Sequence, residues 1–479
     1  MTSYLNPLDS AFLLLETEGA AMRIGAVIEL GDSDIDDATE RYELIRRNIA
    51  ERLHEIPVLA KRVVRAPFDL AWPVLVEDKD FDLDRHLVRV ALPSPGSPEQ
   101  FDALVADYFS RPLSPQRPLW QLLVIEGLES GRSALALKVH HALADGVSGA
   151  ETFANLFDIT PHVRAPLPTP EPEPGSDAEV STPFGLVWSN LRRLLSTPST
   201  ALDVVTSWIA RVDEVGKALL RFLLIRGRRT PVTDQPSIFD ARWTSLNAAS
   251  GVDKEYHRLQ VPLADVKRAS KARGVSVTDF VVASVSGALG RFLVERGETL
   301  ERDLIAFVPI NVRPEGESES LGNQISGMLV RLHTDLEDRE ERLSLISRDA
   351  KKTVGEQRQR RAKIFMDVPR LLGPTLVSWG GRLMSGLGLF DHLPPIANLM
   401  ISSVPGPPIP LWLSGHRVVS AAPVGPLFAS FSLNVTVLGF EENLEFGLLG
   451  CARQIPELSR LRDLVAQEAL AYIEATPEA

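Results

Sequence analysis

The stretch "ALALKVHHALADGVSGAE", residues 134–151, carries most of the information about how this chain folds. Its first part is an apolar run typical of a buried, central strand, and His140 and His141 stand at the end of that run. Ser148, with Glu151 three residues further on, predicts the start of a helix through a capping box. The intervening "HHALADG" is therefore expected to be a tight connection from a strand to a helix.

The two histidines should differ in role. Neighbouring side chains on a strand point to opposite faces, so one imidazole is expected to face a cleft while the other is buried or shields it. Asp145 can lie near the imidazole of His141, or pair with an arginine and hold the loop, and Gly146 permits a close backbone approach or a positive φ. A satisfied core histidine and an aspartate favoured by a helix start are the alternatives for His141 and Asp145.

Other catalytic templates are missing from the chain. It contains no G-x-S-x-G elbow, Walker loop, H-E-x-x-H or G-x-G-x-x-G motif. A histidine base without a nucleophile or metal suits direct transfer, in which it takes the proton of a hydroxyl that attacks an activated acyl group. The single Cys451 excludes an internal disulfide and a multi-cysteine zinc site, is consistent with a reducing cytoplasm, and is a poor nucleophile candidate.

Length and composition predict a protein of two domains. The chain has 479 residues, of which 44% are apolar and 24% charged, as is typical of globular proteins. Its net charge of −12 argues against nucleic-acid binding. The N-terminus lacks the basic region of a signal peptide, and no window approaches the roughly 18 uncharged apolar residues of a spanning helix. Contact with a membrane, if any, is therefore expected at the surface.

Strand and helix patterns occur in both halves, which predicts an α/β (α+β) fold. In the first half they cover residues 23–30 (strand), 36–53 (helix), 118–126 and 133–139 (strands). In the second half they cover 256–297 (a strand and two helices, the second beginning at Ser276 with Asp279 as its capping partner), 304–313 (strand), 431–440 and 444–450 (two strands that pair with each other), and 455–475 (helix).

The middle of the chain has a different composition. Residues 164–183 are rich in proline and acidic residues, which predicts an exposed linker. Residues 184–229 hold eight Arg and Lys against three acidic residues, which indicates either helices packed across both domains or contact with an anionic lipid surface. Residues 364–390 are apolar but interrupted by prolines and glycines, and should form helices that line an apolar cavity or touch lipid. We therefore expect domains at 1–163 and 246–479, separated by 164–245.

Several motifs together point to a known family. The run His140-His141-Ala142-Leu143-Ala144-Asp145-Gly146 has the form H-H-x-x-x-D-G. It is accompanied by "LNPLDSAFL" (5–13), "FDLDRHL" (81–87), "PLW" (118–120), "VPINVRPEGESESLGN" (308–323) and "VPGP" (404–407). In these motifs the chain resembles the bacterial wax ester synthase/diacylglycerol acyltransferase family, from residue 5 to about residue 470.

The resemblance implies two chloramphenicol-acetyltransferase-like domains joined by a linker, with an active-site tunnel at their interface. It implies long-chain acyl-CoA as donor and diacylglycerol or a long-chain fatty alcohol as acceptor. It implies no cofactor and no metal. It also implies a cytoplasmic enzyme that is peripheral at the inner membrane or at lipid droplets. The roles it suggests are His141 as general base without a covalent acyl-enzyme, Asp145 as the residue that orders the loop, and His140 and Gly146 as residues that shape the site. Further site-shaping candidates are Pro118, Leu119, Trp120, Thr278, Asp279, Asn311, Arg313 and Ser403.

Three positions depart from the family pattern. Thr278 stands where the family has the Asn of an Asn-Asp pair, and Ser403 stands where it has the Asn of S-N-V-P-G-P. Ser114 stands where the family has the Asp before P-L-W. Each change replaces an amide or a carboxylate with a hydroxyl. Condensation domains of peptide synthetases carry the same histidine motif. Two alternatives therefore stay open: a stand-alone condensation-type acyltransferase that uses carrier-bound donors, and a catalytically weak lipid-binding paralogue.

Overall fold

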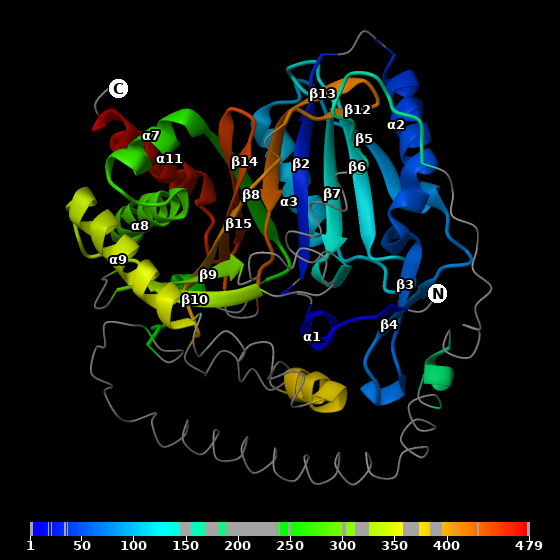
Figure 1. Cartoon of the computed structure of the whole chain (residues 1–479), viewed down its shortest axis with the longest axis horizontal. Helices are drawn as coiled ribbons and strands as arrows, with labels where there is room; N and C mark the ends of the chain where they lie inside the picture. Colours follow the sequence, from blue (N-terminus) through cyan, green and yellow to red (C-terminus); the bar gives the residue numbers. More distant parts are fainter. Residues whose placement is uncertain are drawn as a thin grey trace.

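The structure is a computed structural model of the chain. It describes residues 3–17, 19–20, 22–32, 35, 37–143, 155–167, 182–186, 188, 236, 240–247, 251–298, 303–311, 325–357, 373–383, 395–407, 409–428 and 431–476. Figure 1 shows two sheets side by side, each covered by helices. The α/β (α+β) class predicted from the sequence is confirmed.

The first sheet has six strands in the order β12-β13-β2-β7-β6-β5. They are β2 (Arg23–Leu30), β5 (Leu87–Ala91), β6 (Trp120–Glu126), β7 (Ala134–His140), β12 (Trp412–Leu413) and β13 (His416–Val424). β5 and β6 are parallel, and the other pairs are antiparallel. β7 lies between β2 and β6 and is buried at every residue, so the prediction of a central strand is confirmed.

Two helices cover opposite faces of this sheet. α2 (Ala38–Arg52) packs Ile45 and Ile49 onto one face, and the carboxylate of Asp37 caps its first turn. α3 (Pro98–Ser110) packs Val105 and Phe109 onto the other face. That second face is the one turned toward the second sheet (Figure 1).

A small sheet and a short helix lie at the lower edge of the first sheet in Figure 1. The sheet has the order β1-β4-β3, with β1 at Ser3–Tyr4, β3 at Lys61–Val64 and β4 at Val74–Glu77. α1 (Pro7–Leu15) begins at Asn6, whose side chain caps Asp9 N–H. Short 3₁₀ turns occupy Leu53–Glu55, Pro57–Ala60, Pro67–Asp69, Leu83–Arg85, His141–Leu143 and Ser245–Asn247.

The second sheet has the order β10-β9-β11-β14-β15-β8. Its strands are β8 (Lys254–Pro262), β9 (Ile305–Asn311), β10 (Ile325–Arg331), β11 (Leu399–Val404), β14 (Leu433–Phe440) and β15 (Asn443–Cys451). Its helices are α7 (Leu263–Ala272), α8 (Val277–Glu295), α9 (Arg339–Gln357) and α11 (Leu458–Glu474). A further helix covers 373–383, within the apolar region 364–390, and lies beside α1.

α8 forms the core of the second domain. The predicted capping box is present, because Ser276 accepts the Asp279 N–H and Asp279 accepts the Ser276 N–H. Within the described residues, α8 is the one helix long and apolar enough to cross a membrane. Most of that segment is buried against the surrounding helices and sheet, as expected for a core helix.

The two domains are interlocked. β12 and β13 come from the second half of the sequence but belong to the first sheet, where β13 pairs with β2 and β12 pairs with β13. Arg258 on β8 donates to Asp102 on α3 and to Glu29 on β2, at 3.2 and 2.6 Å. A pairing of strands from both halves cannot be inferred from local patterns, because those carry no information about partners distant in sequence.

The other predicted elements are confirmed to within a few residues: β2, α2, β6, β8, α7, β9, the antiparallel pair β14 and β15, and α11. The helix predicted after Ser148, and most of both the linker and the basic segment, lie outside the described residues. The domain boundaries at 163 and 245 stay predictions.

Candidate active site

The histidine pair stands where β7 ends. His140 is the last residue of the strand and its N–H donates to Leu119 O, at 2.9 Å. His141 begins the 3₁₀ turn His141–Leu143, and its N–H donates to Met22 O, at 2.7 Å. His140 thus belongs to the strand and His141 to the turn, so the alternation of side chains along a strand does not apply to this pair.

His140 is buried and makes contacts through both sides of its ring. Only 1% of its surface is exposed, and its Nδ1 accepts the N–H of Ala142 at 3.0 Å. Because Nδ1 is an acceptor, the ring proton belongs on Nε2. Nε2 lies 3.4 Å from a carboxylate oxygen of Glu16, the residue that follows α1. His140 therefore links the end of α1 to the turn that carries His141.

Charged groups surround His140. Arg23 pairs with His140 across β2 and β7, and its Nε lies 3.6 Å from Glu16. Burial raises the pKa of Glu16, but the nearby His140 Nε2 and the charge of Arg23 more than offset this, so its pKa is below the ordinary value. Burial lowers the pKa of Arg23, and Glu16 partly offsets that shift. Glu16 is thus an anion that faces two nitrogen groups.

His141 has the properties of a neutral base. Burial, and next the nearby His140, lower its pKa from 6.5 to about 4, so the imidazole is uncharged near neutral pH. Its ring lies 4.6 Å from the ring of Phe12, at an interplanar angle of 55°. Its Nδ1 has no hydrogen-bond partner among the described residues. A half-buried, neutral imidazole of this kind can accept a proton from a bound hydroxyl.

A second buried cation lies two residues before His140, on the same side of β7. Lys138 donates to Tyr108 O and Arg111 O at the end of α3, at 2.6 and 3.1 Å, and its Nζ lies 3.9 Å from the Tyr108 ring centroid. Burial, followed by the charges of Arg23 and Arg111, lowers its pKa to about 7. Lys138 and Arg23 both bind carbonyls at the C-terminal end of α3, where cations are favoured.

Pro118, Leu119 and Trp120 lie next to the histidines in different ways. Leu119 packs with Ala142 and Leu13 directly at the turn. Trp120 belongs to the opposite face of the sheet: its Nε1 donates to Leu59 O at 2.7 Å, and its ring stacks on His86, which in turn stacks on Phe81. Pro118 accepts the Trp120 N–H, at 2.9 Å. The segments 81–87 and 118–120 thus meet in one stack.

The remaining predicted site residues are not joined to the histidines by hydrogen bonds in the described part of the chain. Asp279 is buried and accepts from Ser347 Oγ at 3.0 Å as well as capping α8 with Ser276, and Thr278 is half-buried beside it. Ser403 is half-buried on β11, and Asn311 ends β9. Asp145, Gly146, Arg313 and the side chain of Asn311 lie outside the described residues.

Sequence reasoning missed Phe12, Glu16, Arg23 and Lys138. Phe12 stands inside "LNPLDSAFL", where its position was the available signal. Lys138 was visible as a single charge within an apolar strand. Nothing in the sequence marks Glu16 or Arg23, since their proximity to His140 results from long-range strand and helix packing.

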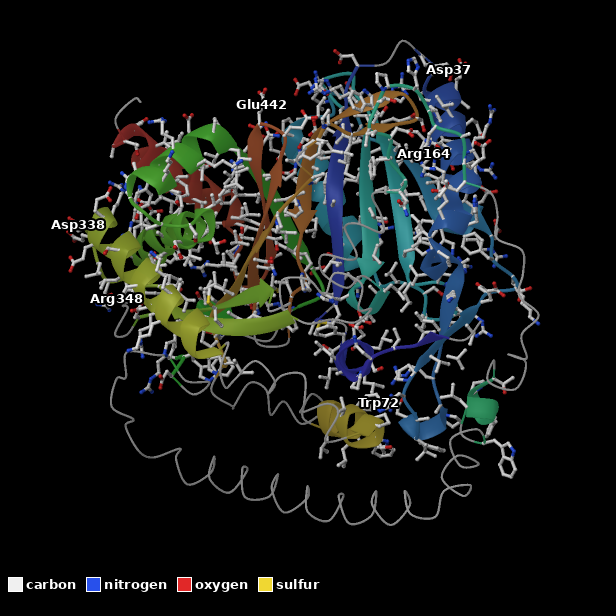
Figure 2. The ribbon with its side chains drawn as sticks, viewed as in Figure 1. Asp37, Trp72, Arg164, Asp338, Arg348 and Glu442 are labelled. Atoms are coloured by element: carbon white, nitrogen blue, oxygen red, sulfur yellow. The ribbon has the colours of Figure 1, made fainter. Side chains whose placement is uncertain are left out.

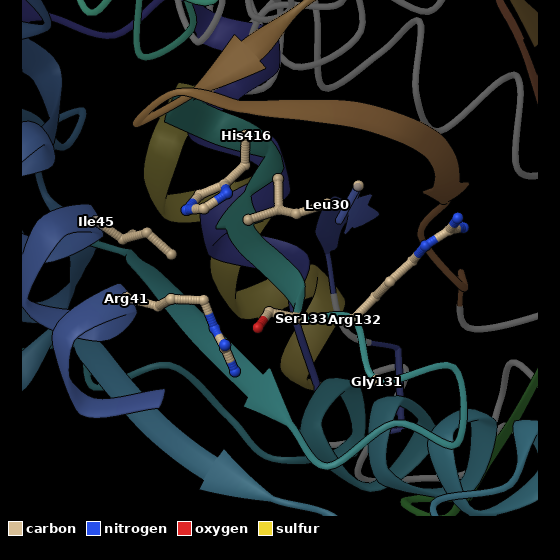
Figure 3. A pocket seen from close by; sticks show the side chains of 8 residues that line it. Leu30, Arg41, Ile45, Gly131, Arg132, Ser133 and His416 are labelled. Carbon is tan, nitrogen blue, oxygen red and sulfur yellow. The ribbon is translucent and has the colours of Figure 1, made fainter. Parts of the chain in front are cut away.

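A pocket in the described structure lies away from the histidines. Figure 3 shows its lining side chains, which include Arg41, Ser133 and His416. Ser133 precedes β7 while His140 ends it, so the two places are roughly 20 Å apart along the strand. This pocket therefore plays no part in the site at the histidines.

Comparisons with known proteins identify the family of the chain. A sequence model of the wax ester synthase/diacylglycerol acyltransferase catalytic domain matches residues 5–281, and one of the family's C-terminal domain matches residues 321–474. A Mycobacterium tuberculosis protein that bears a diacylglycerol O-acyltransferase name is 31% identical over 470 residues, covering 96% of this chain and 88% of the relative.

Solved structures share the fold. The wax ester synthase/diacylglycerol acyltransferase of Marinobacter aquaeolei VT8 superposes with a TM-score of 0.68 at 25% identity, covering 98% of each chain. The first condensation domain of the calcium-dependent antibiotic synthetase superposes with a TM-score of 0.56 at 18% identity, over 100% of this chain and 98% of that domain. The latter likeness shows the fold alone. The sequence matches cover both halves, and the chain belongs to the wax ester synthase/diacylglycerol acyltransferase family and is an acyltransferase.

Proposed function

We propose that this acyltransferase moves a long-chain acyl group from acyl-CoA to the hydroxyl of diacylglycerol or a long-chain fatty alcohol, forming triacylglycerol or wax ester. The observation that carries the proposal is the neutral, half-buried imidazole of His141, held in a turn that His140 and Glu16 order. Acyl-CoA is a co-substrate, and no further cofactor is needed for this reaction.

In the proposed reaction His141 acts as general base. The hydroxyl oxygen attacks the thioester carbonyl carbon as its proton passes to His141. The tetrahedral intermediate then expels the CoA thiolate, which takes the proton back from the imidazolium, and the C–S bond is replaced by a C–O bond. Positioned base catalysis contributes about 10²–10⁴-fold, so substrate positioning must supply much of the remaining acceleration.

His140, Glu16 and Phe12 support that step. The hydrogen bond from Ala142 N–H to His140 closes the turn, and Phe12 limits the motion of the His141 ring. Asp145 and Gly146 are assigned to the loop that follows, with Asp145 as the ordering residue. The interface between the two domains is assigned as the substrate tunnel, because the cluster around His140 faces it.

The acceptors are insoluble in water, so we assign the enzyme to the cytoplasmic side of a membrane or to a lipid-droplet surface as a peripheral protein. This location is supported by the exposed apolar side chains described below. The basic segment 184–229 is a further candidate for contact with anionic lipid.

Substrate profiling tests the proposal. Purified protein is incubated with palmitoyl-CoA and either diolein or hexadecanol, and both CoA release and the ester product are measured. Formation of triacylglycerol or wax ester is the expected result. Activity solely with carrier-bound donors would overturn the donor assignment, and no turnover with any donor would indicate a lipid-binding paralogue.

A further inference from the structure

The loop after β3 turns large apolar side chains toward solvent. Phe68 is 72% exposed and Leu70 56% exposed, whereas Asp69 between them is buried. Phe68 and Asp69 have φ of 55° and 54°, in the left-handed region that few side chains other than glycine adopt. This uncommon backbone keeps Phe68 outside while Asp69 points inward.

Helix 373–383 presents an apolar stripe on its outer side. Leu376, Trp379 and Leu383 are 39%, 53% and 61% exposed, and their spacing of three and seven residues places them on one face. Val377 and Ser378 are buried on the inner side. The usual arrangement of a surface helix, with polar residues outward, is therefore reversed at these three positions.

Asp69 joins the loop to the helix. Its carboxylate accepts hydrogen bonds from Ser378 and, at 3.0 Å, from Arg382, and it also pairs with Arg65. Trp379 Nε1 donates to Phe68 O at 3.3 Å. The two groups of exposed side chains are thus parts of one fixed surface, which we name the docking face: Phe68, Leu70, Leu376, Trp379 and Leu383.

We propose that the docking face inserts into the headgroup region of a lipid bilayer that carries anionic lipids. Exposed leucines with Phe and an amphipathic Trp are the side chains that partition to this depth. The charged residues of segments 65–72 and 373–383 are Arg65, Arg382 and Asp69, so this surface is locally cationic in a chain of net charge −12. Both arginines are partly exposed beside it, and the charge complements an anionic surface.

The docking face also lies close to the histidines. Val377 of helix 373–383 packs with Ala11 and Leu14 of α1, and a Cβ on Gly381 would lie 2.5 Å from Leu15 Cδ2. Phe12, on the same helix α1, contacts His141. Figure 1 shows α1 between this helix and the end of β7, and Figure 2 shows Trp72 at the same edge. Only α1 would therefore lie between His141 and a bilayer on the docking face. A lipid acceptor would have a short distance to travel from the bilayer to His141.

Vesicle binding tests the docking face directly. The variant Leu376→Ser/Leu383→Ser is compared with the control Ile159→Ser/Leu470→Ser, whose residues are 66% and 46% exposed elsewhere on the surface. Flotation with phosphatidylcholine vesicles containing phosphatidylglycerol should show binding of the wild type and the control, and at least roughly tenfold weaker binding of the docking variant. Equal binding by all three proteins would overturn the proposal.

Two further measurements identify the partner. Binding should weaken when phosphatidylglycerol is omitted or the salt concentration is raised, because the arginines act through charge. If the wild type does not bind vesicles but forms a dimer that the docking variant loses, the face contacts a second copy and the proposal is wrong. Circular dichroism of both variants verifies that they fold.

This proposal rests on the proposed function, since the bilayer is taken as the source of the acceptor, and the two can fail separately. With palmitoyl-CoA and a water-soluble short-chain alcohol, the docking variant should react at the wild-type rate, while with diolein in vesicles it should be slower. Vesicle binding by an inactive wild type would refute the proposed function and leave the docking face supported. Activity with soluble alcohol but no vesicle binding would refute the docking face alone.

Discussion

A carboxylate oxygen of Glu16 lies 3.4 Å from Nε2 of His140, on the side of the ring opposite the Nδ1 that accepts Ala142 N–H. One imidazole therefore joins the end of α1 to the turn that presents His141. The hydrogen bond at Nδ1 sets the tautomer of this buried ring, and the nearby carboxylate of Glu16 favours the proton on Nε2. In the proposed mechanism Glu16 is accordingly a positioning residue for His141, with no direct part in proton transfer.

Replacement of Glu16 should lower kcat more than it changes KM. Loss of a charge-assisted contact to His140 in Glu16→Ala is expected to reduce kcat about tenfold to hundredfold. Glu16→Gln keeps an acceptor oxygen and should recover part of the rate. Steady-state kinetics of the two variants measure this. Equal rates for Glu16→Ala and the wild type would show that the contact does not position the turn.

The pH profile should reflect the lowered pKa of His141. Its folded-state pKa of about 4 is below the ordinary 6.5, so the base stays neutral and active as pH falls through 6.5 and is protonated near pH 4. Between these values the unfolded chain binds more protons, so this group's contribution to stability also decreases as pH falls. We expect kcat/KM to show no acidic limb at 6.5 while the protein stays folded. A fall in kcat/KM with a midpoint near pH 6.5, at a pH where circular dichroism shows that the protein is still folded, would contradict the role of His141 as the base with a lowered pKa.

The buried ion pair between Arg52 and Asp158 should stabilise the segment that follows the histidine loop. Nη2 of Arg52 lies 2.8 Å from Asp158, and both side chains are almost fully buried. Arg52→Ala would leave a buried carboxylate without its partner, at a cost of about 3–5 kcal/mol in unfolding free energy. Urea denaturation measures this.

Arg46 provides the matched control on the same helix. It pairs with exposed Asp84 at 2.7 Å, so Arg46→Ala should cost less than about 1 kcal/mol. Similar losses of unfolding free energy in the two variants would mean that burial does not make the Arg52–Asp158 pair more stabilising than the exposed Arg46–Asp84 pair.

The sequence predicted the local elements well because their patterns are local. The apolar run of β7, the capping box of Ser276 and Asp279, and the pairing of β14 with β15 each depend on residues close together in the chain. The course of β13 into the first sheet, and the contact of Glu16 with His140, depend on packing between distant segments. Patterns within a single sequence carry no information about such contacts. The family resemblance suggested His141 as the base, with His140, Asp145 and Gly146 around it, but it did not point to Glu16 or Phe12.

The apolar region 364–390 illustrates the same limit. Its composition indicated helices that line a cavity or touch lipid, and helix 373–383 does present an apolar stripe to solvent. Which side of that helix is outward follows from the contacts of Ser378 and Arg382 with Asp69, about 300 residues earlier in the chain. The sequence alone could not choose between the two orientations.

The rate of ester formation by His141→Ala tests the central claim most directly. Wild type and variant are compared with palmitoyl-CoA and diolein or hexadecanol, with CoA release and ester product both quantified and folding verified by circular dichroism. The account predicts that the variant folds and that its kcat falls about 10²–10⁴-fold. A folded His141→Ala protein that makes ester at the wild-type rate would contradict it.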